Sequence, residues 1–290
     1  MTLYDYFVAP FADYAFMRRA LIGASVLSLS ACPVGVFLML RRMSLMGDAM
    51  AHAILPGAAV GFLFAGLAIL PMTFGGLAAG LLVALFAGAV SRLTIQREDA
   101  SLAAFYLISL ALGVLLVSLK GSTVDLMHVL FGTVLALNDA ALILIGVVAT
   151  LTILSLGVVW RALVAECLDP VFLRSVSKSG PPVHFIFLML VVLNLVSGFQ
   201  ALGTLLAVGI MMLPAAAARF WFRDLEPMCL AAMLIGIVSS YAGLVISYHW
   251  SIASGPAIIL TAGVIYIASL ALAPRGILVN RLRPQRHRIA

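Results

Sequence analysis

The sequence has very little charge. Only 10% of its 290 residues are Asp, Glu, Lys or Arg, whereas a soluble domain has about 25%, and 64% of the residues are hydrophobic. So few charged side chains cannot cover a water-facing surface, which excludes a soluble globular protein. Apolar runs of about 18–22 residues recur along the chain, and this is the length that crosses a hydrocarbon core. The sequence therefore predicts an all-α, polytopic transmembrane bundle, because the alternating strands of an outer-membrane barrel are absent from it.

Cysteine and the common catalytic motifs are also scarce. The three cysteines, Cys32, Cys167 and Cys229, form no CxxC pair, which excludes a disulfide framework and a zinc cluster and favours a packing role. The residues of LKGST at 119–123 stand in the wrong order for a phosphate-binding loop. No H-E-x-x-H occurs, since His52 is followed by AILP, so an intramembrane metalloprotease is disfavoured. We therefore expect no enzyme, and we expect any ATP to be hydrolysed by a separate chain.

The hydrophobic runs predict nine membrane spans. They lie at about 20–40, 49–70, 73–92, 102–119, 140–161, 183–200, 202–221, 228–248 and 255–273. Only GFQALG separates the sixth from the seventh, so two short spans and one broken helix both remain open, and the total is eight or nine. Glycines and prolines in several spans fit a transport protein, although a sealed structural bundle would use glycine in the same way.

Basic residues lie almost entirely in alternate connections. Nine follow odd-numbered spans, Lys120 alone follows an even-numbered one, and five more stand in the basic tail at 274–290. The positive-inside rule therefore predicts a cytoplasmic tail and an external N-terminal segment at 1–17. Arg18 and Arg19 violate this rule, and snorkelling to the outer interface is the available explanation. Because the net charge of +6 is spread between spans, no patch for nucleic acid is predicted.

One short stretch, RRMSLMGDAMAHAILPG at 41–57, combines the first strongly basic connection with two ionisable residues of the second span. Asp48 and His52 stand four residues apart, which on a helix is about 400° of rotation and about 6 Å of rise, so both side chains leave one face. A carboxylate and an imidazole suit Zn, Mn or Fe(II), whereas Mg and Ca prefer oxygen ligands. Placing such a group in a bilayer costs on the order of 3 kcal/mol, which makes the pair a candidate metal site.

A structural interpretation of the same pair stays open. Asp48 could be the N-cap of the helix AMAHAILPG, with His52 hydrogen-bonded to a neighbouring carbonyl group. This interpretation explains Asp48 but leaves His52 without a role.

A second cluster lies in GSTVDLMHVLFGTVLALND, residues 121–139. Asp125 and His128 are three residues apart and would share one helix face beside an external connection, which makes them weaker metal candidates or contacts for an outside partner. They could equally be surface residues of a short interfacial helix. Asn138 and Asp139 are expected to cap the start of the fifth span.

Two further histidines have structural explanations. His184 follows a Pro-Pro pair and is expected to mark a helix start. His249 stands next to Trp250 and is expected to belong to an interfacial aromatic belt.

The segment 219–228 is expected to form a short cytoplasmic helix between two spans. Its charged residues flank three aromatic ones, Phe220, Trp221 and Phe222, and comprise Arg219, Arg223, Asp224 and Glu226. Such a helix offers either a docking surface for a soluble partner or an anchor in the lipid headgroup layer.

Several stretches together resemble a known family. RRMSLMGDAMAHAILPGAAVGF (41–62) is similar to the signature of the metal-ion ABC transporter permeases of the zinc, manganese and iron type. Three further stretches agree, namely VDLMHVLFGTVLAL (124–137), GTLLAVGIMMLPAAAARF (203–220) and ISYHWSIASGPAIIL (246–260). The resemblance covers the whole chain. Ala51 replaces a serine common in the family, and His128 stands where serine or alanine is frequent, which could tilt the preference toward zinc.

The resemblance implies a fold like that of the cobalamin-type importers. It implies a permease subunit in the bacterial cytoplasmic (inner) membrane that pairs with a second copy of itself, a cytoplasmic ABC ATPase dimer and an external or periplasmic metal-binding protein. It also implies a transient metal site at Asp48 and His52, ATPase docking at 219–228 with 165–180 as the second candidate, and a divalent metal ion as substrate with no permanently bound cofactor.

The main alternative is a stand-alone secondary carrier or channel for metal ions or metal-chelates. The identity of the metal and the bilayer depth of Asp48 and His52 stay open, because Arg41 and Arg42 place the pair only a turn or two from the cytoplasmic boundary.

Overall fold

A computed structural model of the chain describes residues 3–66, 68–96, 98–119, 134–168 and 180–277. Within these ranges the backbone forms helices and connections without a strand, which confirms the all-α prediction. The helices are α1 (Leu3–Phe7), α2 (Ala9–Asp13), α3 (Ala15–Leu40), α4 (Met46–Ala53), α5 (Leu55–Ala65), α6 (Ile69–Leu93), α7 (Glu98–Leu119), η1 (Val134–Ala136), α9 (Asp139–Leu168), α11 (Gly180–Leu202), α12 (Thr204–Trp221), α13 (Leu225–Trp250) and α14 (Ser254–Leu272).

The hydrophobic runs correspond closely to these helices. Eight helical stretches of the described chain are long and apolar enough to cross a membrane, with α4 and α5 together forming one of them, and α7 contains a shorter apolar stretch at Ala100–Leu116. The sixth and seventh runs are two separate helices, α11 and α12. Gly203 between them has a φ of 93°, a conformation that glycine adopts without steric cost, so the break between the helices is sharp.

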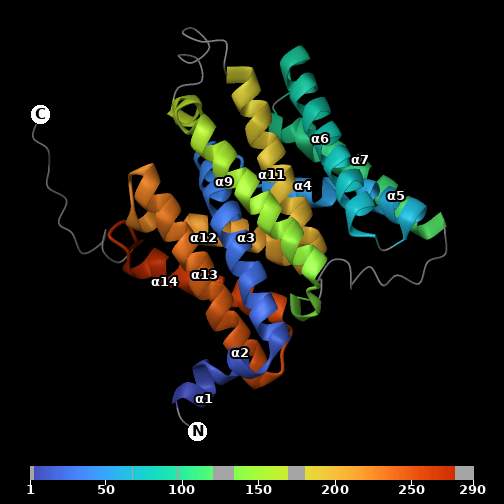
Figure 1. Cartoon of the computed structure of the whole chain (residues 1–290). Coiled ribbons are helices and arrows are strands. Elements are labelled where there is room, and N and C mark those ends of the chain that lie inside the picture. The colour runs from blue at the N-terminus through green and yellow to red at the C-terminus, as the bar shows by residue number, and fades with distance from the viewer. Residues whose placement is uncertain (1–2, 67, 97, 120–133, 169–179, 278–290) are drawn as a thin grey trace, which may run out of the picture.

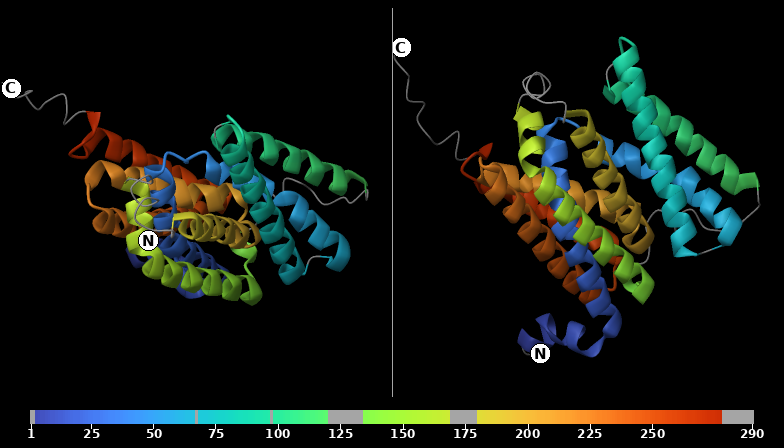
Figure 2. Two further views of the ribbon diagram at one scale, coloured as in Figure 1. Left: turned by 90° about the horizontal axis from the view of Figure 1, so that it is seen from above. Right: turned by 45° about the horizontal axis from the view of Figure 1, so that its top comes forward.

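The helices form two groups (Figures 1 and 2). In the larger group, α3 packs against α9, α11, α12 and α13, and α14 packs against α12 and α13. The inner surface of α3 is built from small residues such as Ala20, Ala24 and Ala31, all fully buried, which lets the neighbouring helices approach closely. In the smaller group, α4, α5, α6 and α7 pack together beside α11 and α12. The boundary between the two groups therefore runs along α4, α6, α11 and α12.

Helices α5 and α6 touch through their backbones. A Cβ atom added to Gly57 would lie 1.9 Å from the Gly75 carbonyl oxygen, and one added to Gly75 would lie 2.1 Å from the Gly57 oxygen. One turn further along α5, a Cβ on Gly61 would lie 2.5 Å from the Pro71 oxygen. Such an approach is possible only between residues without side chains, so these glycines fix how the two helices cross.

Gly57→Ala is expected to destabilise the protein, because the added methyl group cannot be accommodated without moving a backbone. We expect a loss of about 1–3 kcal/mol in the free energy of unfolding, typical of overpacking, measured by denaturation in detergent. The matched control is Gly146→Ala in α9, where an added Cβ meets no atom within 4 Å. That control should be neutral or slightly stabilising, since alanine favours helix more than glycine does. Equal stability of the two variants would contradict the backbone contact.

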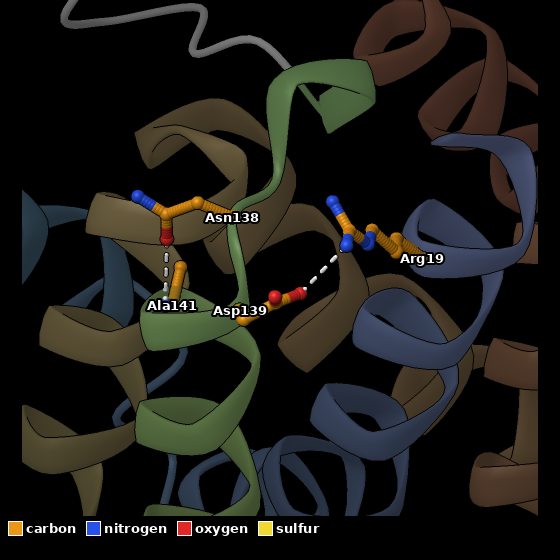
Figure 3. Close-up of polar contacts among 4 residues, drawn as sticks. All are labelled: Arg19, Asn138, Asp139 and Ala141. Atoms are coloured by element: carbon orange, nitrogen blue, oxygen red, sulfur yellow. Dashed lines mark hydrogen bonds and ion pairs between the residues drawn. The ribbon is translucent and has the colours of Figure 1, made fainter. Parts of the chain in front are cut away.

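The two arginines that violate the positive-inside rule both have polar partners, and Figure 3 shows that of Arg19. Arg19 Nη2 lies 2.9 Å from Asp139 Oδ1 at the start of α9. Arg18 Nη1 donates hydrogen bonds to the carbonyl oxygens of Ala12, at 2.7 Å, and Phe11, at 3.3 Å. Arg19 is therefore ion-paired and Arg18 hydrogen-bonded at the end of the bundle that the rule predicts to be external, and snorkelling of these side chains stays a prediction.

The same end carries two features expected from the sequence. Asn138 caps α9, because its side-chain oxygen accepts a hydrogen bond from the Ala141 N–H at 2.8 Å (Figure 3). His249, near the end of α13, stacks on Tyr6 of α1 with ring centroids 3.9 Å apart, and its Nε2 lies 2.9 Å from the Tyr6 carbonyl oxygen. Helices α1 and α2 are thereby held against the end of α13 (Figure 1).

Candidate functional site

The candidate metal pair lies on a short helix that a turn separates from α3 and that a one-residue interruption at Ile54 divides from α5. Helix α3 ends at Leu40, and Arg42 has a φ of 60°, which turns the chain sharply before α4 begins at Met46. Helix α4 continues to Ala53, and α5 then starts with Pro56 in its first turn. Proline is suited to the first turn of a helix, because the backbone N–H groups there have no acceptor within the helix and the N–H that proline lacks is not needed. The two interruptions leave α4 as an eight-residue unit carrying Asp48 and His52.

Asp48 and His52 lie on the same face of α4, as their spacing predicts. Asp48 Oδ1 and His52 Nε2 are 3.8 Å apart, which is too far for a hydrogen bond between them. The Asp48 side chain is 70% exposed, whereas the His52 side chain is 30% exposed. A carboxylate oxygen and an imidazole nitrogen thus lie near each other without a hydrogen bond between them, so both atoms can accept another ligand.

The capping interpretation of this pair is wrong. The N-cap of α4 is Leu45, which makes no capping side-chain hydrogen bond, and Asp48 lies inside the first helical turn. A carboxylate there is favoured by the helix dipole but does not cap the helix. The Nδ1 atom of His52 is buried and has no hydrogen-bond partner in the described part of the chain, so no carbonyl group satisfies it. Buried polar atoms are normally bonded, so this ring nitrogen is left available for a further ligand.

Helix α7 holds the junction between α4 and α5. Ser109 donates a hydrogen bond of 2.9 Å to the carbonyl oxygen of Ala53, and a Cβ added to Gly113 would lie 3.0 Å from Pro56 N. The Tyr106 ring stacks loosely on the His52 imidazole, with centroids 6.3 Å apart and planes at 29°. One neighbouring helix therefore contacts the His52 ring loosely and holds the backbone just after it.

The neighbours of α4 place the pair away from the ends of the bundle. Gly47 faces Val208 and Met212, which lie in the body of α12 rather than at its ends. Ile54 contacts Gly76 and Gly80 of α6, and the latter also faces Val192 of α11. Asp48 and His52 are thus level with the middle of three long helices. The sequence alone suggests a shallower position, because it treats Arg41 and Arg42 as an ordinary connection.

Arg41 is buried, and its environment explains this difference. Its Nη2 atom lies 2.5 Å from Glu166 Oε1, and the two side chains are only 8% and 10% exposed. His184 of α11 approaches the same carboxylate, with Nδ1 3.6 Å from Oε1. The sequence assigns Glu166 to a polar cytoplasmic stretch, whereas it lies inside α9. No signal in the sequence distinguishes Glu166 from the other polar residues of that stretch.

The segment 219–228 forms no separate helix, contrary to the prediction. Helix α12 continues to Trp221, and α13 already begins at Leu225. Trp221 Nε1 donates to Ser269 Oγ at 3.0 Å, and Arg275 Nη1 donates to the Phe222 carbonyl oxygen at 2.8 Å. The connection is short because α12 continues to the end of its hydrophobic run and α13 begins three residues before its own. The charged residues predicted for docking, Arg219, Arg223, Asp224 and Glu226, are all exposed.

The remaining candidates divide into two sets. Asp125 and His128 lie outside the described residues, as does most of the second docking candidate at 165–180. Cys32, Cys167 and Cys229 are free thiols, and the first and last are buried, as expected for packing residues. In the described ranges, no group of three or more His, Cys, Asp and Glu side chains is arranged to hold a metal ion.

A bundle of membrane-crossing helices, with an open carboxylate–imidazole pair on an interrupted helix inside it, defines a multi-pass membrane transport protein. The chain belongs to the ABC 3 transport family, which matches residues 13–273. It is 33% identical over 271 residues to the manganese import system permease protein ScaB of Streptococcus gordonii, covering 93% of this chain and 95% of that protein. It is 31% identical over 278 residues to the manganese transport system membrane protein MntC of Listeria monocytogenes, covering 96% and 98%.

A solved structure agrees. PsaBC from Streptococcus pneumoniae, determined in complex with a Fab, matches with a TM-score of 0.85 and 30% identity, covering 97% of this chain and 100% of that chain. These matches confirm the predicted fold class and the family, and they identify the chain as the permease subunit of an ABC importer rather than an enzyme.

Proposed function

We propose that this permease imports Mn²⁺ and that Asp48 and His52 bind the ion transiently on its way through the membrane. The observation that carries the proposal is the open pair on α4, whose two facing atoms are 3.8 Å apart and whose second imidazole nitrogen has no partner in the described chain. One carboxylate and one imidazole, completed by water, form a weak site from which an ion can leave, as conduction requires.

The exposure of Asp48 supports a second copy of this chain as partner. The carboxylate is 70% exposed although α4 lies level with the middle of α12. An ionised group facing lipid at this depth costs on the order of 3 kcal/mol, so the face needs a polar covering. A pathway between two copies provides one, with a site that both copies or their bound water complete.

The remaining partners follow from the importer class. A cytoplasmic ABC ATPase dimer supplies the energy, because the chain has no phosphate-binding loop of its own. An external or periplasmic metal-binding protein delivers the ion, and the complex lies in the bacterial inner membrane. Two relatives carry manganese in their names, which supports this metal over zinc and iron.

Manganese preference can be tested by competition in proteoliposomes that contain the permease, its ATPase and its metal-binding protein. Mn²⁺ is expected to be carried fastest when each metal is supplied alone. Zn²⁺ is expected to slow Mn²⁺ uptake, because it binds a given nitrogen–oxygen site more tightly and leaves it more slowly. Faster transport of zinc or iron alone would contradict the manganese assignment. Uptake by the permease alone, without ATP, would instead support the secondary carrier.

A further inference from the structure

A buried ionic cluster joins three helices at the start of the connection that leads to Asp48. Arg41 follows the last residue of α3, Glu166 lies in the last turn of α9, and His184 lies near the start of α11. The Arg41–Glu166 contact is 2.5 Å, and the Arg41 guanidinium also lies 4.9 Å from the centroid of the Phe187 ring. A cation over an aromatic face is attracted to it, so Phe187 adds to the hold on Arg41.

A buried ion pair contributes little net stability, because desolvation of the two charges offsets much of their attraction. It does constrain geometry, since moving one partner away leaves the other buried and uncompensated at a cost of several kcal/mol. The Arg41–Glu166 contact therefore acts as a strong positional constraint between α3 and α9. The contact therefore contributes more to the relative position of α3 and α9 than to the stability of the fold.

The short turn between Arg41 and α4 connects the Arg41–Glu166 contact to the helix that carries Asp48 and His52. Arg42 has the left-handed φ of 60°, Met43 N–H donates to the Leu38 oxygen at 2.9 Å, and Met46 N–H donates to the Met43 oxygen at 3.0 Å. Met43 and Met46 are buried, so packing of their side chains restrains the short turn between α3 and α4. A displacement of Arg41 must move the beginning of α4. The other end of α4 is held separately, by Ser109 of α7 on Ala53.

We propose that Arg41 and Glu166 are a positioning pair that couples α9 and α11 to the metal site, by holding the cytoplasmic-side end of α4 in register with them. This inference rests on the proposed function. With the pair intact, a movement of α9 and α11 driven by the ATPase changes the position of Asp48 and His52. With the pair broken, α4 keeps its fold and its ligands, but its first turn no longer follows the two helices. ATP is then hydrolysed without moving metal.

The test is the number of Mn²⁺ ions transported per ATP hydrolysed by the complete complex in proteoliposomes. Glu166→Gln keeps the shape of the side chain and removes its charge. We expect it to lower this ratio about tenfold, within the range usual for coupling between sites. The Glu166 side chain is only 10% exposed and so is not on the outer surface of the 165–180 docking candidate. Assembly and basal ATP hydrolysis are therefore expected to stay unchanged. The charge swap Arg41→Glu with Glu166→Arg should restore part of the ratio. Arg42→Gln is the matched control, because Arg42 is an exposed arginine in the same turn and should leave the ratio unchanged.

Two results would overturn the inference. One is an unchanged ratio in Glu166→Gln. The other is a ratio that falls only together with assembly and thermal stability and is not restored by the charge swap, because that pattern shows a purely structural pair. Failure of the proposed function is distinguishable from both, since the unmodified complex would then show no ATP-driven Mn²⁺ uptake at all.

Discussion

Mn²⁺ uptake is expected to fall on the order of 100-fold in His52→Ala, and Asp48→Asn should have a similar effect, because ligand loss costs at least as much as loss of an outer-shell partner. Each substitution removes one of only two protein ligands that the described chain offers at this point. Asp48→Asn keeps the size of the side chain and removes the charge that attracts the cation. The measurement is the initial rate of ATP-driven uptake of radioactive manganese, normalised to the amount of assembled complex.

Two matched controls separate a metal-binding role from a general loss of charge. Asp139→Asn removes a carboxylate that is 74% exposed and pairs with Arg19 (Figure 3). His249→Ala removes an imidazole that stacks on Tyr6. Both controls should retain most of the uptake. Wild-type rates in Asp48→Asn and His52→Ala, at equal expression, would show that the ion takes another path.

The second large effect is expected at the connection between α12 and α13. Changing Arg219 and Arg223 to alanine should reduce co-purification of the ATPase at least about tenfold, if these exposed cations belong to the centre of the docking surface. The backbone there should be unaffected, because the bonds from Trp221 to Ser269 and from Arg275 to Phe222 use other atoms. Pull-down of the ATPase with the purified permease measures the effect directly.

The control for this prediction is the double variant Arg18→Ala with Arg19→Ala. It removes the same amount of positive charge from the side of the membrane that is predicted to be external. ATPase binding should be unaffected there. Normal co-purification of the Arg219 and Arg223 variant would assign this connection to the lipid headgroup layer instead and leave docking to another cytoplasmic surface.

Much of the fold is predictable from the sequence, since a membrane span needs a long apolar run and each predicted run corresponds to a helix, except the second, which is divided between α4 and α5. The shared face of Asp48 and His52 is predictable too, because it depends only on local helical spacing. Contacts between distant segments are not. The pairing of Arg41 with Glu166 depends on how α3 meets α9, and neither residue differs in sequence from an ordinary residue in a cytoplasmic connection.

Some local backbone conformations could not be predicted from the sequence either. The left-handed Arg42 could not be predicted, because this conformation is uncommon outside glycine, asparagine and aspartate. The short α12–α13 connection was also missed, since the polar residues of 219–228 gave no sign that they continue the flanking helices. In both places, tertiary packing decided a conformation that local sequence left undetermined.

The pairing of Arg19 with Asp139 has a consequence for biosynthesis. On the predicted topology, Arg19 would cross the membrane before Asp139 is synthesised, because α3 precedes α9 in the chain. Arg18 is in a different position, because the carbonyl groups that accept its hydrogen bonds precede it in the chain. On that topology, Arg19 therefore enters the bilayer ahead of its ion-pair partner, whereas the carbonyl groups that bond Arg18 are already present.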